Sequence, residues 1–305
     1  MDYYAAQDAF RSALMSELGN APSVLEEGRL QRFDDPDKRK GNKNCWCVFY
    51  YHQPWAAGCF GNWALDFKQN WSLGNEQRFT AEERAAFERK RREAQNLLQL
   101  TAQEKHQQAA AQAQCIWDQS QPADPRHPYL LKKGVPPGMA RQNQMGQLVL
   151  QVKDWEQQSL ISLQFIQADG SKRYLKGGRK KGGCMPVHCP ENPLLVLICE
   201  GWATGQTLAM AYPKALVLAG LDAGNLLAVA RQIQQLYPHL PRVICGDDDR
   251  LSPGNPGRSK AQQAALQTGA EVLLPDWPET APPDLKDFND LAVWLQHANA
   301  TRSGA

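Results

Sequence analysis

The sequence lacks the features of membrane and secreted proteins. No apolar run approaches the roughly 20 residues needed to cross a bilayer, and the start, from Met1 to Asp8, has neither the basic nor the apolar segment of a signal peptide. We therefore expect a cytoplasmic protein with no membrane partner. Two nucleotide-binding patterns, G-x-x-x-x-G-K-[ST] and G-x-G-x-x-G, are also missing, which argues against an ATP-driven helicase and against a dinucleotide enzyme.

Cysteine is present, but not in the order typical of a zinc site. The two C-x₂-C pairs of a structural zinc ribbon are absent. Cys199 and Cys245 fall inside apolar runs, as free buried thiols do in a reducing compartment. Zinc stays open as the less favoured alternative at two groups: Cys45, Cys47, His52 and Cys59, and Cys184, His188 and Cys189.

Charge of one sign is in excess only locally. The formal net charge is +2, so nothing global requires a nucleic-acid partner. One stretch of ten residues nevertheless holds six cations and no acid: Lys172, Arg173, Lys176, Arg179, Lys180 and Lys181. Such a density attracts phosphates, and the alternative is a merely solvated hairpin.

The first part of the chain indicates a small module. With 305 residues the protein is long enough for two or three domains. Apolar spacing predicts a helix in residues 1–20, strands at 29–33 and 45–51, and a tight antiparallel turn at 58–63. We interpret residues 1–75 as an α+β module. Its tryptophans either stack on bases or, as we favour, fill its core: Trp46, Trp55, Trp63 and Trp71.

A helical linker at residues 76–121 and a basic subdomain at 122–190 follow. Capping boxes at Thr80 and Thr101 predict one helix to about Asp118, or two end to end, and one helix would be about 58 Å long. We favour a solvated spacer over a DNA-contacting helix. Strands are expected at 148–152, 160–166 and 173–175, in antiparallel hairpins.

Residues 191–305 have a different pattern. Short apolar runs at 194–199, 215–219, 242–245 and 271–274 alternate with helical patterns at 203–212, 222–236 and 258–268. This alternation predicts an α/β domain with a central parallel sheet covered by helices.

Acidic residues follow several of these strands. Glu200 follows the first and Asp247 and Asp249 follow the third, while Asp287 and Asp290 come after the fourth. The carboxyl ends of parallel strands meet at one edge of a sheet, so these carboxylates should converge there. Clustered carboxylates bind Mg²⁺ or Mn²⁺, which can serve phosphoryl chemistry.

At these residues the chain resembles a family. The segments Leu195-Val-Leu-Ile-Cys-Glu-Gly201, Ile244-Cys-Gly-Asp-Asp-Asp-Arg250 and Asp287-Phe-Asn-Asp290 are similar to the Toprim domain of bacterial-type primases, topoisomerases and some nucleases. The stretch from Leu163 to Gly178 is similar to the segment before Toprim in primases of the DnaG type. The resemblance covers about residues 125–298 and is closest to primases of plasmids, phages and other mobile elements.

The resemblance implies a role for each matching residue. Glu200 is implied to lie near the reacting hydroxyl as a candidate general base and is also a candidate metal ligand. The metal is implied to be held by Asp247 and Asp249, with Asp287 completing the site. The resemblance implies contacts with template or nucleotide phosphates for six basic residues: Lys172, Arg173, Lys176, Arg179, Lys180 and Arg250. Supporting positions are Gly201, Asp248 and Asp290. Asp248 stands where the family often has Gly, which leaves open which of the three consecutive carboxylates face the metal.

The implied activity is a DNA primase that makes short RNA primers on single-stranded DNA from ribonucleoside triphosphates, with Mg²⁺ or Mn²⁺. The alternatives are a Toprim nuclease and a non-catalytic nucleic-acid-binding module of a replication complex. A replicative helicase on another chain is a candidate partner. Because the zinc ribbon of complete replicative primases is absent, residues 1–75 are a candidate for template binding.

Overall fold

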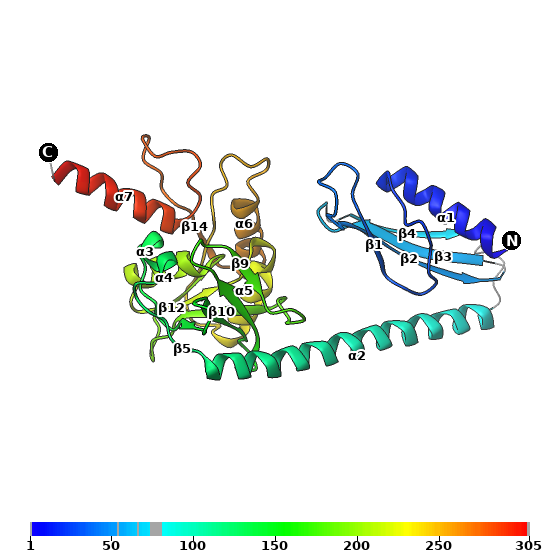
Figure 1. Ribbon diagram of the computed structural model, residues 1–305, viewed down its shortest axis with the longest axis horizontal. Helices are drawn as coiled ribbons and strands as arrows, with labels where there is room; N and C mark the ends of the chain where they lie inside the picture. Colours follow the sequence, from blue (N-terminus) through cyan, green and yellow to red (C-terminus); the bar gives the residue numbers. More distant parts are fainter. Residues whose placement is uncertain (1, 54, 66, 74–80, 304–305) are drawn as a thin grey trace. The chain divides into compact units, whose positions relative to one another are not determined.

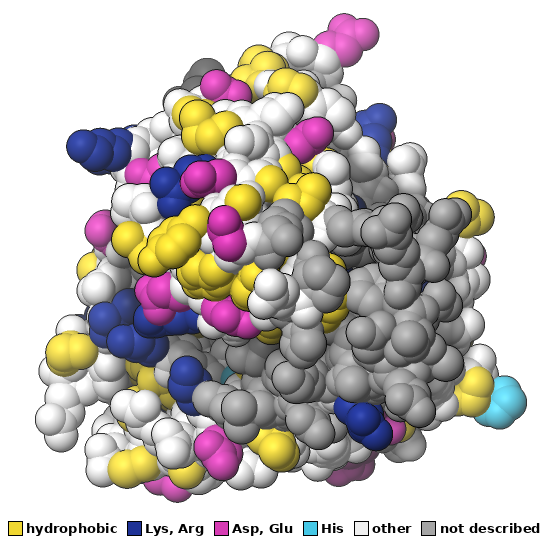
Figure 2. Space-filling view, turned by 90° about the vertical axis from the view of Figure 1, so that its right-hand side faces the viewer, with side chains coloured by type: hydrophobic (Ala, Val, Ile, Leu, Met, Phe, Trp, Pro, Cys, Tyr) yellow, Lys and Arg dark blue, Asp and Glu magenta, His cyan; other side chains and the backbone are white. Residues whose placement is uncertain are grey.

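The computed structural model describes residues 2–53, 55–65, 67–73 and 81–303. The chain divides into two compact units, residues 1–100 and 101–305 (Figure 1). None of the described helices has the length and apolar character that crossing a membrane requires. Acidic and basic side chains are interspersed on the face seen in Figure 2, as the small net charge would lead one to expect.

The first unit is a helix packed on an antiparallel sheet. Helix α1 (Tyr3–Leu18) is followed by β1 (Gln31–Phe33), β2 (Cys45–His52), β3 (Trp55–Asn62) and β4 (Phe67–Leu73), in the order β1-β2-β3-β4. The Asp2 carboxylate caps α1 by accepting a hydrogen bond from the backbone N–H of Ala5. The predicted helix and the first two strands are confirmed, whereas the turn expected at residues 58–63 is wrong because most of this segment lies in β3.

The core of this unit lies between α1 and one face of the sheet. Phe10 and Leu14 are fully buried, and the Phe10 ring lies 5.3 Å from that of Phe49 and 4.9 Å from that of Trp71. Trp71 therefore belongs to the core, as the favoured interpretation of the tryptophans predicts, whereas that interpretation is wrong for Trp63, which is 59% exposed.

Helix α2 (Ala81–Gln119) is one continuous helix of 39 residues, not two. The capping residue expected at Thr80 lies outside the described residues. Near its end, α2 packs on the second unit: Ala113 is buried against Val149 and Leu163. Arg141 also lies over the Trp117 ring, at 4.5 Å from its centroid, so this end of α2 has more than a spacer's contacts.

The second unit is built on one ten-stranded sheet in the order β14-β13-β11-β12-β10-β7-β6-β5, with β8 on β7 and β9 on β8. Helix α3 (Pro128–Lys133) lies early in this unit. The strands are β5 (Gln121–Pro122), β6 (Arg141–Gln142), β7 (Leu148–Asp154), β8 (Ser159–Ile166), β9 (Lys172–Tyr174), β10 (Gly183–His188), β11 (Leu195–Cys199), β12 (Ala215–Ala219), β13 (Arg242–Cys245) and β14 (Glu271–Leu273).

Parallel and antiparallel pairing meet at β12 in this sheet, because β12 pairs in parallel with β11 and antiparallel with β10. Strands β11 to β14 pair in parallel, which confirms the predicted parallel sheet. Strand β10, which the sequence pattern did not predict, pairs antiparallel with β12 and with β7. It therefore joins the basic subdomain and the parallel part in one sheet. The boundary placed at residue 190 stays a prediction.

Helices cover both faces of the parallel part. They are α4 (Trp202–Ala211), α5 (Leu226–Leu236) and α6 (Pro256–Thr268), and the short helix η2 (Ala223–Asn225) precedes α5. Helix α7 (Phe288–Ser303) packs on α4 and α3. Side chains of β11 alternate between the faces: Leu197 packs with α4 on one side and Ile198 with α5 and α6 on the other.

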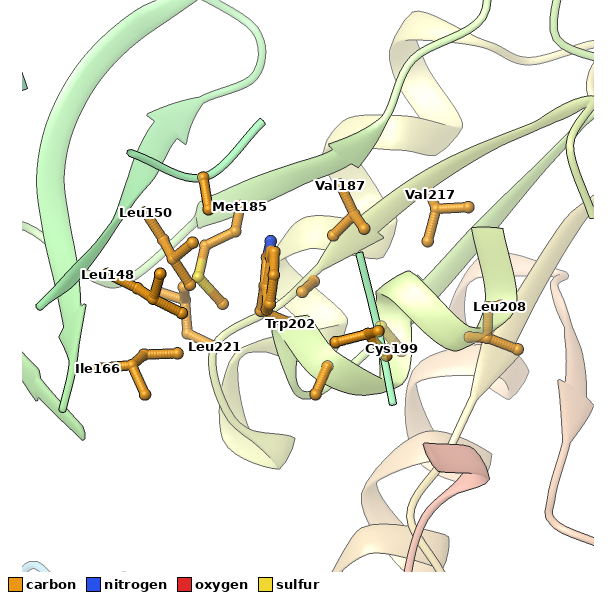
Figure 3. Packing of buried hydrophobic residues seen from close by; sticks show 14 of the residues in the cluster. Leu148, Leu150, Ile166, Met185, Val187, Cys199, Trp202, Leu208, Val217 and Leu221 are labelled. Atoms are coloured by element: carbon orange, nitrogen blue, oxygen red, sulfur yellow. The ribbon is translucent and has the colours of Figure 1, made fainter. Parts of the chain in front are cut away.

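Trp202 is the centre of the core that spans the joined sheet. Its indole stands between Leu148, Leu150 and Met185 on one side and Val187 and Cys199 on the other (Figure 3). The side chain is 2% exposed. Because its neighbours come from both parts of the sheet, this residue helps to fix the position of the basic subdomain relative to the parallel strands.

Cys199 and Cys245 are buried free thiols, as the apolar runs around them predict. Burial raises the pKa of Cys47 and of Cys245, so both stay neutral and apolar at ordinary pH. Cys45, Cys184 and Cys199 are also fully buried.

Replacing Trp202 by alanine should lower the free energy of unfolding of residues 101–305 by about 3–5 kcal/mol, because it leaves a large cavity where two parts of the sheet meet. Urea unfolding followed by circular dichroism measures the change. Leu194→Ala is the control: its side chain is 59% exposed, and its removal should cost less than about 0.5 kcal/mol. Equal effects of the two substitutions would contradict the assignment of Trp202 to the core.

Candidate functional site

The candidate site lies at the carboxyl ends of β11 and β13. Cys199 and Cys245 are register partners in these adjacent parallel strands, which lie about 4.8 Å apart. Glu200 follows one of them directly and Asp247 follows the other by two residues. The backbone amide of Asp247 lies close enough to the Glu200 carboxylate to lower its pKa, against the larger effect of burial. The two strand ends are therefore brought together as expected.

A loop returns to the same edge and brings Asp287 there. The backbone N–H of Asp248 donates to the carbonyl of Lys286 at 2.6 Å, which ties this loop to the end of β13. Asp287 comes next, and its Oδ1 accepts from the backbone N–H of Asp290 at 2.9 Å, in the first turn of α7. Three chain segments thus contribute carboxylates to one site.

These carboxylates raise the pKa of one another. Burial is the main cause for Asp247, whose pKa rises to about 9, and the charges of Glu200 and Asp287 add to it. Burial also raises the pKa of Glu200 to about 7, and Asp249 contributes by repulsion. The pKa of Asp287 is raised by burial and by Asp290. Removal from water and like charge both disfavour ionisation here.

Asp248 faces away from this cluster. Its Oδ1 accepts from Asn255 Nδ2 at 2.6 Å and pairs with Arg258 at 3.0 Å, and its Oδ2 accepts from Trp277 Nε1 at 3.0 Å. The residue is 1% exposed. A carboxylate with these partners stabilises the turn after β13. Of the three consecutive acids, Asp247 and Asp249 are therefore the ones we expect to face the cluster.

Asp249 is tied to the start of α6. Its Oδ2 accepts from the backbone N–H of Gly257 at 3.2 Å, and its Oδ1 pairs with Lys286 at 3.3 Å. A side chain at position 257 would meet the backbone carbonyl of Asp247 at 2.6 Å, so only glycine lets α6 approach this closely. Gly201, by contrast, directly precedes α4 and makes no side-chain cap.

Three lysines surround the acids. Lys133 pairs with Asp290 at 3.0 Å and Lys286 pairs with Asp249. Lys172 comes from β9 in the basic hairpin. Crowding by protein atoms lowers its pKa most and the charge of Lys133 lowers it further, while the charges of Asp287 and Asp247 raise it. The hairpin therefore brings a lysine close to the carboxylates.

The other basic candidates do not share this position. Arg173 and Lys176 line a separate groove of about 450 Å³ beside Ile116 and Gln147, and Arg173 donates to Gln147 Oε1 at 3.2 Å. The remaining three have partners of their own: Arg179 pairs with buried Asp154, Lys180 with Asp222, and Arg250 lies over the Trp277 ring. The ten-residue basic stretch thus does not act as one patch: Lys172 lies near the acids, Arg173 and Lys176 line the groove, and Arg179 and Lys180 pair with other acids.

The donor set suits a divalent cation. Buried Glu200 Oε1 and Asp247 Oδ1 have no hydrogen-bond partner, and unpaired buried carboxylate oxygens are costly unless a cation neutralises them. Within the described residues, no three or more Asp, Glu, His or Cys side chains already have the spacing of a metal site. The chemistry of the residues therefore fits Mg²⁺ or Mn²⁺, although the side chains do not form a closed ligand cage.

Some contributors could not be identified from the sequence pattern. Lys133 and Lys286 reach the acids only through the return of distant segments. Asn289, which donates to the carbonyl of Lys133 at 2.7 Å and to Thr207 Oγ1 at 3.0 Å, fixes α7 against α3 and α4. For Lys133 the sequence indicated a position at the end of a helix, because Gly134 follows it and ends α3 in the left-handed conformation, but not its proximity to the acids.

Comparison with known proteins identifies the parallel part of the sheet. Residues 195–296 match the family described as the Toprim domain, so the chain carries a Toprim domain. Two relatives from Escherichia coli are both named DNA primase TraC. The first is 38% identical over 196 residues, which cover 60% of this chain and 18% of the relative. The second is 42% identical over 122 residues, 37% of this chain and 8% of the relative.

The chain spans less than a fifth of the length of these relatives. A solved primase fragment of the bacteriophage T7 primase-helicase matches with a TM-score of 0.43 and 15% identity, covering 57% of this chain and 72% of the fragment. Likeness at this level carries no argument about chemistry. The resemblance to Toprim primases inferred from the sequence is confirmed by the Toprim match and the TraC relatives.

Asp247→Asn should stabilise the metal-free protein at pH 8. The pKa of Asp247 is raised from 3.8 to about 9, so folding favours the protonated carboxyl, and the stability it allows at low pH is lost as pH rises from about 4 to about 9. Asparagine removes this loss. We expect a gain of at least about 1 kcal/mol, or about 2–4 °C in melting temperature.

Melting temperatures in EDTA at pH 5 and pH 8 measure the effect, and the gain should be larger at pH 8. The matched control is Asp248→Asn. This variant should be less stable at both pH values, because one of its two carboxylate oxygens becomes an amide nitrogen, which cannot accept the hydrogen bond from Asn255 or Trp277, and because the charge that pairs with Arg258 is lost. An Asp247→Asn protein that melts below the wild type at pH 8 would contradict the raised pKa of Asp247 and its explanation by burial and repulsion.

Proposed function

We propose that this Toprim-domain chain is a DNA primase, which joins ribonucleotides into short RNA primers on single-stranded DNA. The observation that carries the proposal is the gathering of the half-buried Glu200, Asp247 and Asp287 at one sheet edge, with Lys172 of the basic hairpin near enough for the charges of Asp247 and Asp287 to raise its pKa. The relatives named DNA primase support it.

In the proposed reaction, the 3′-hydroxyl oxygen of the growing strand forms a bond to the α-phosphorus of the incoming triphosphate. The bond from that phosphorus to the pyrophosphate oxygen breaks, and the hydroxyl proton passes to Glu200. A carboxylate whose pKa is raised to about 7 suits this role, since a general base works best when its pKa lies near the working pH.

We infer that Asp247, Asp249 and Asp287 hold the divalent cation. A bound Mg²⁺ or Mn²⁺ would neutralise charge on the phosphate oxygens and on the departing pyrophosphate. The protein's own contribution is to hold the three carboxylates at one sheet edge. Asp290 supports this arrangement by pairing with Lys133 and by accepting from the backbone N–H of Lys286.

The cations have different proposed roles. Lys172, which faces the acids, would bind the triphosphate. Arg173 and Lys176 in the groove would bind template phosphates, as would Arg250. Arg179 pairs with Asp154 and Lys180 pairs with Asp222. We therefore favour a role for these two cations in stabilising the hairpin over direct contact with phosphates. A replicative helicase on another chain is a proposed partner.

Glu200→Gln and Asp247→Asn should each lower the rate of primer synthesis by at least about 100-fold, because each removes a carboxylate that acts in the transition state. The assay follows incorporation of labelled ribonucleotides on single-stranded DNA with Mg²⁺ or Mn²⁺. Asp284→Asn, at an exposed position outside the cluster, should leave the rate unchanged. Metal-dependent cutting of nucleic acid with no synthesis would instead select the nuclease alternative.

Lys172→Gln should raise the KM for ribonucleoside triphosphates by about tenfold, as expected for loss of one charged contact. Lys176→Gln removes the same charge from the same hairpin, but in the groove, and should change template affinity with little effect on this KM. Steady-state kinetics with each substrate varied in turn distinguish the two. Equal effects on the triphosphate KM would contradict the separation of the basic stretch.

A further inference from the structure

The first unit has a sheet face that carries aromatic and basic side chains. Helix α1 lies along the other face (Figure 1). The strand register places four residues in one row across the open face: Arg32 opposite Trp46, Trp46 opposite Gly61, and Gly61 opposite Lys68. A cation therefore stands at each end of a row that has an indole in the middle.

The indole in this row is one of a stacked pair. The rings of Trp46 and Trp63 lie 5.2 Å apart at 28°. A side-chain carbon at position 61 would come within 3.0 Å of the Trp46 ring, so glycine lets this ring lie flat on the sheet. Trp46 is 8% exposed and Trp63 is 59% exposed. Trp46 thus supports the ring of Trp63 from below, and much of the Trp63 surface stays open to solvent.

The charge of this face is of one sign. Arg32 and Lys68 are exposed, and three strand spacings separate them by about 14 Å. Arg32 is held in place by its two hydrogen bonds to the carbonyl of Lys43. None of the outward-facing positions of the described strands β1 to β4 is acidic, and Asp34, which follows β1, is paired with Lys43.

We propose that this face binds unpaired nucleotides, with a base stacked on Trp63 and the neighbouring phosphates attracted by Arg32 and Lys68. An exposed indole held rigidly gives a base a stacking surface at little entropic cost, and flanking cations suit the strand's backbone. The binding would be tolerant of sequence, because every base has a stacking face. The inference deepens the proposed function, since an unpaired strand is what a primase copies.

A protein partner is less well matched to this face. The two cations at the ends of the row would lose water on burial and would need carboxylates from the partner. A phosphate backbone supplies negative charge at regular intervals on either side of a stacked base. The position of the cations beside the indole pair therefore favours a nucleic-acid strand as the occupant.

The test uses the full chain and a fluorescein-labelled single-stranded DNA of mixed sequence, without triphosphates or metal. Trp63→Ala should weaken binding measured by anisotropy by about 5- to 100-fold, the effect of losing one base-stacking contact. Trp63→Phe should retain binding within about threefold. Lys68→Gln should lower the salt dependence of the affinity by about one phosphate contact.

Two controls and one direct measurement make the outcome clear. Leu65→Ala, an exposed apolar residue in the same turn, should bind as the wild type does. Binding of an abasic strand should change less than twofold in Trp63→Ala. With 5-iododeoxyuridine in the strand, photocrosslinking and peptide mapping should place a crosslink at Trp63. Crosslinks confined to residues 101–305, with unchanged affinity of Trp63→Ala, would overturn the inference.

The failure of this inference and of the proposed function can be told apart by primer synthesis at saturating template. Synthesis by a Trp63→Ala protein that binds DNA as the wild type does would remove the inference and leave the primase. Trp63-dependent binding by a wild-type chain that makes no RNA under any metal would remove the primase and leave the binding face.

Discussion

Repulsion among carboxylates that are largely withdrawn from water is the constraint on which the second unit depends. Glu200 and Asp247 each have a buried oxygen with no hydrogen-bond partner. Lys133 and Lys286 pair with Asp290 and Asp249 instead. The protein thus compensates the outer acids and leaves the inner two uncompensated. Such an arrangement lowers the stability of the metal-free fold, and it makes affinity for a divalent cation a direct consequence of the geometry.

The sheet keeps the acids and the basic hairpin in a fixed relation despite this repulsion. Strand β10 pairs with a Toprim strand on one side and with a strand of the basic subdomain on the other. Trp202 fills the core beneath both. A hairpin attached only through a loop could change its position in response to nearby charges. Lys172 instead extends from a strand of the same sheet. The electrostatic meeting of lysine and carboxylates is therefore a property of the packed core.

The sequence allowed prediction of those parts of the site that follow from strand direction alone. Glu200 and Asp247 end adjacent parallel strands, and the alternation of apolar runs and helices was enough to place them together. Part of strand β3 was predicted as a turn because glycines such as Gly58 and Gly61 are typical of turns. In the structure these two positions are glycine because aromatic rings and backbone atoms approach them too closely for a side chain. Lys133 and Lys286 arrive through long-range returns of the chain, which no local pattern encodes.

The three consecutive aspartates show how one turn meets opposite demands. Asp248 has a cation, an amide and an indole as partners, so its burial holds the backbone in place. That backbone carries Asp247 on one side and Asp249 on the other, and the charges of both act on the cluster: Asp249 raises the pKa of Glu200 and of Asp247. A glycine at position 248 would remove this anchor beside Asp247. Asp248 therefore stabilises the turn that holds the uncompensated Asp247.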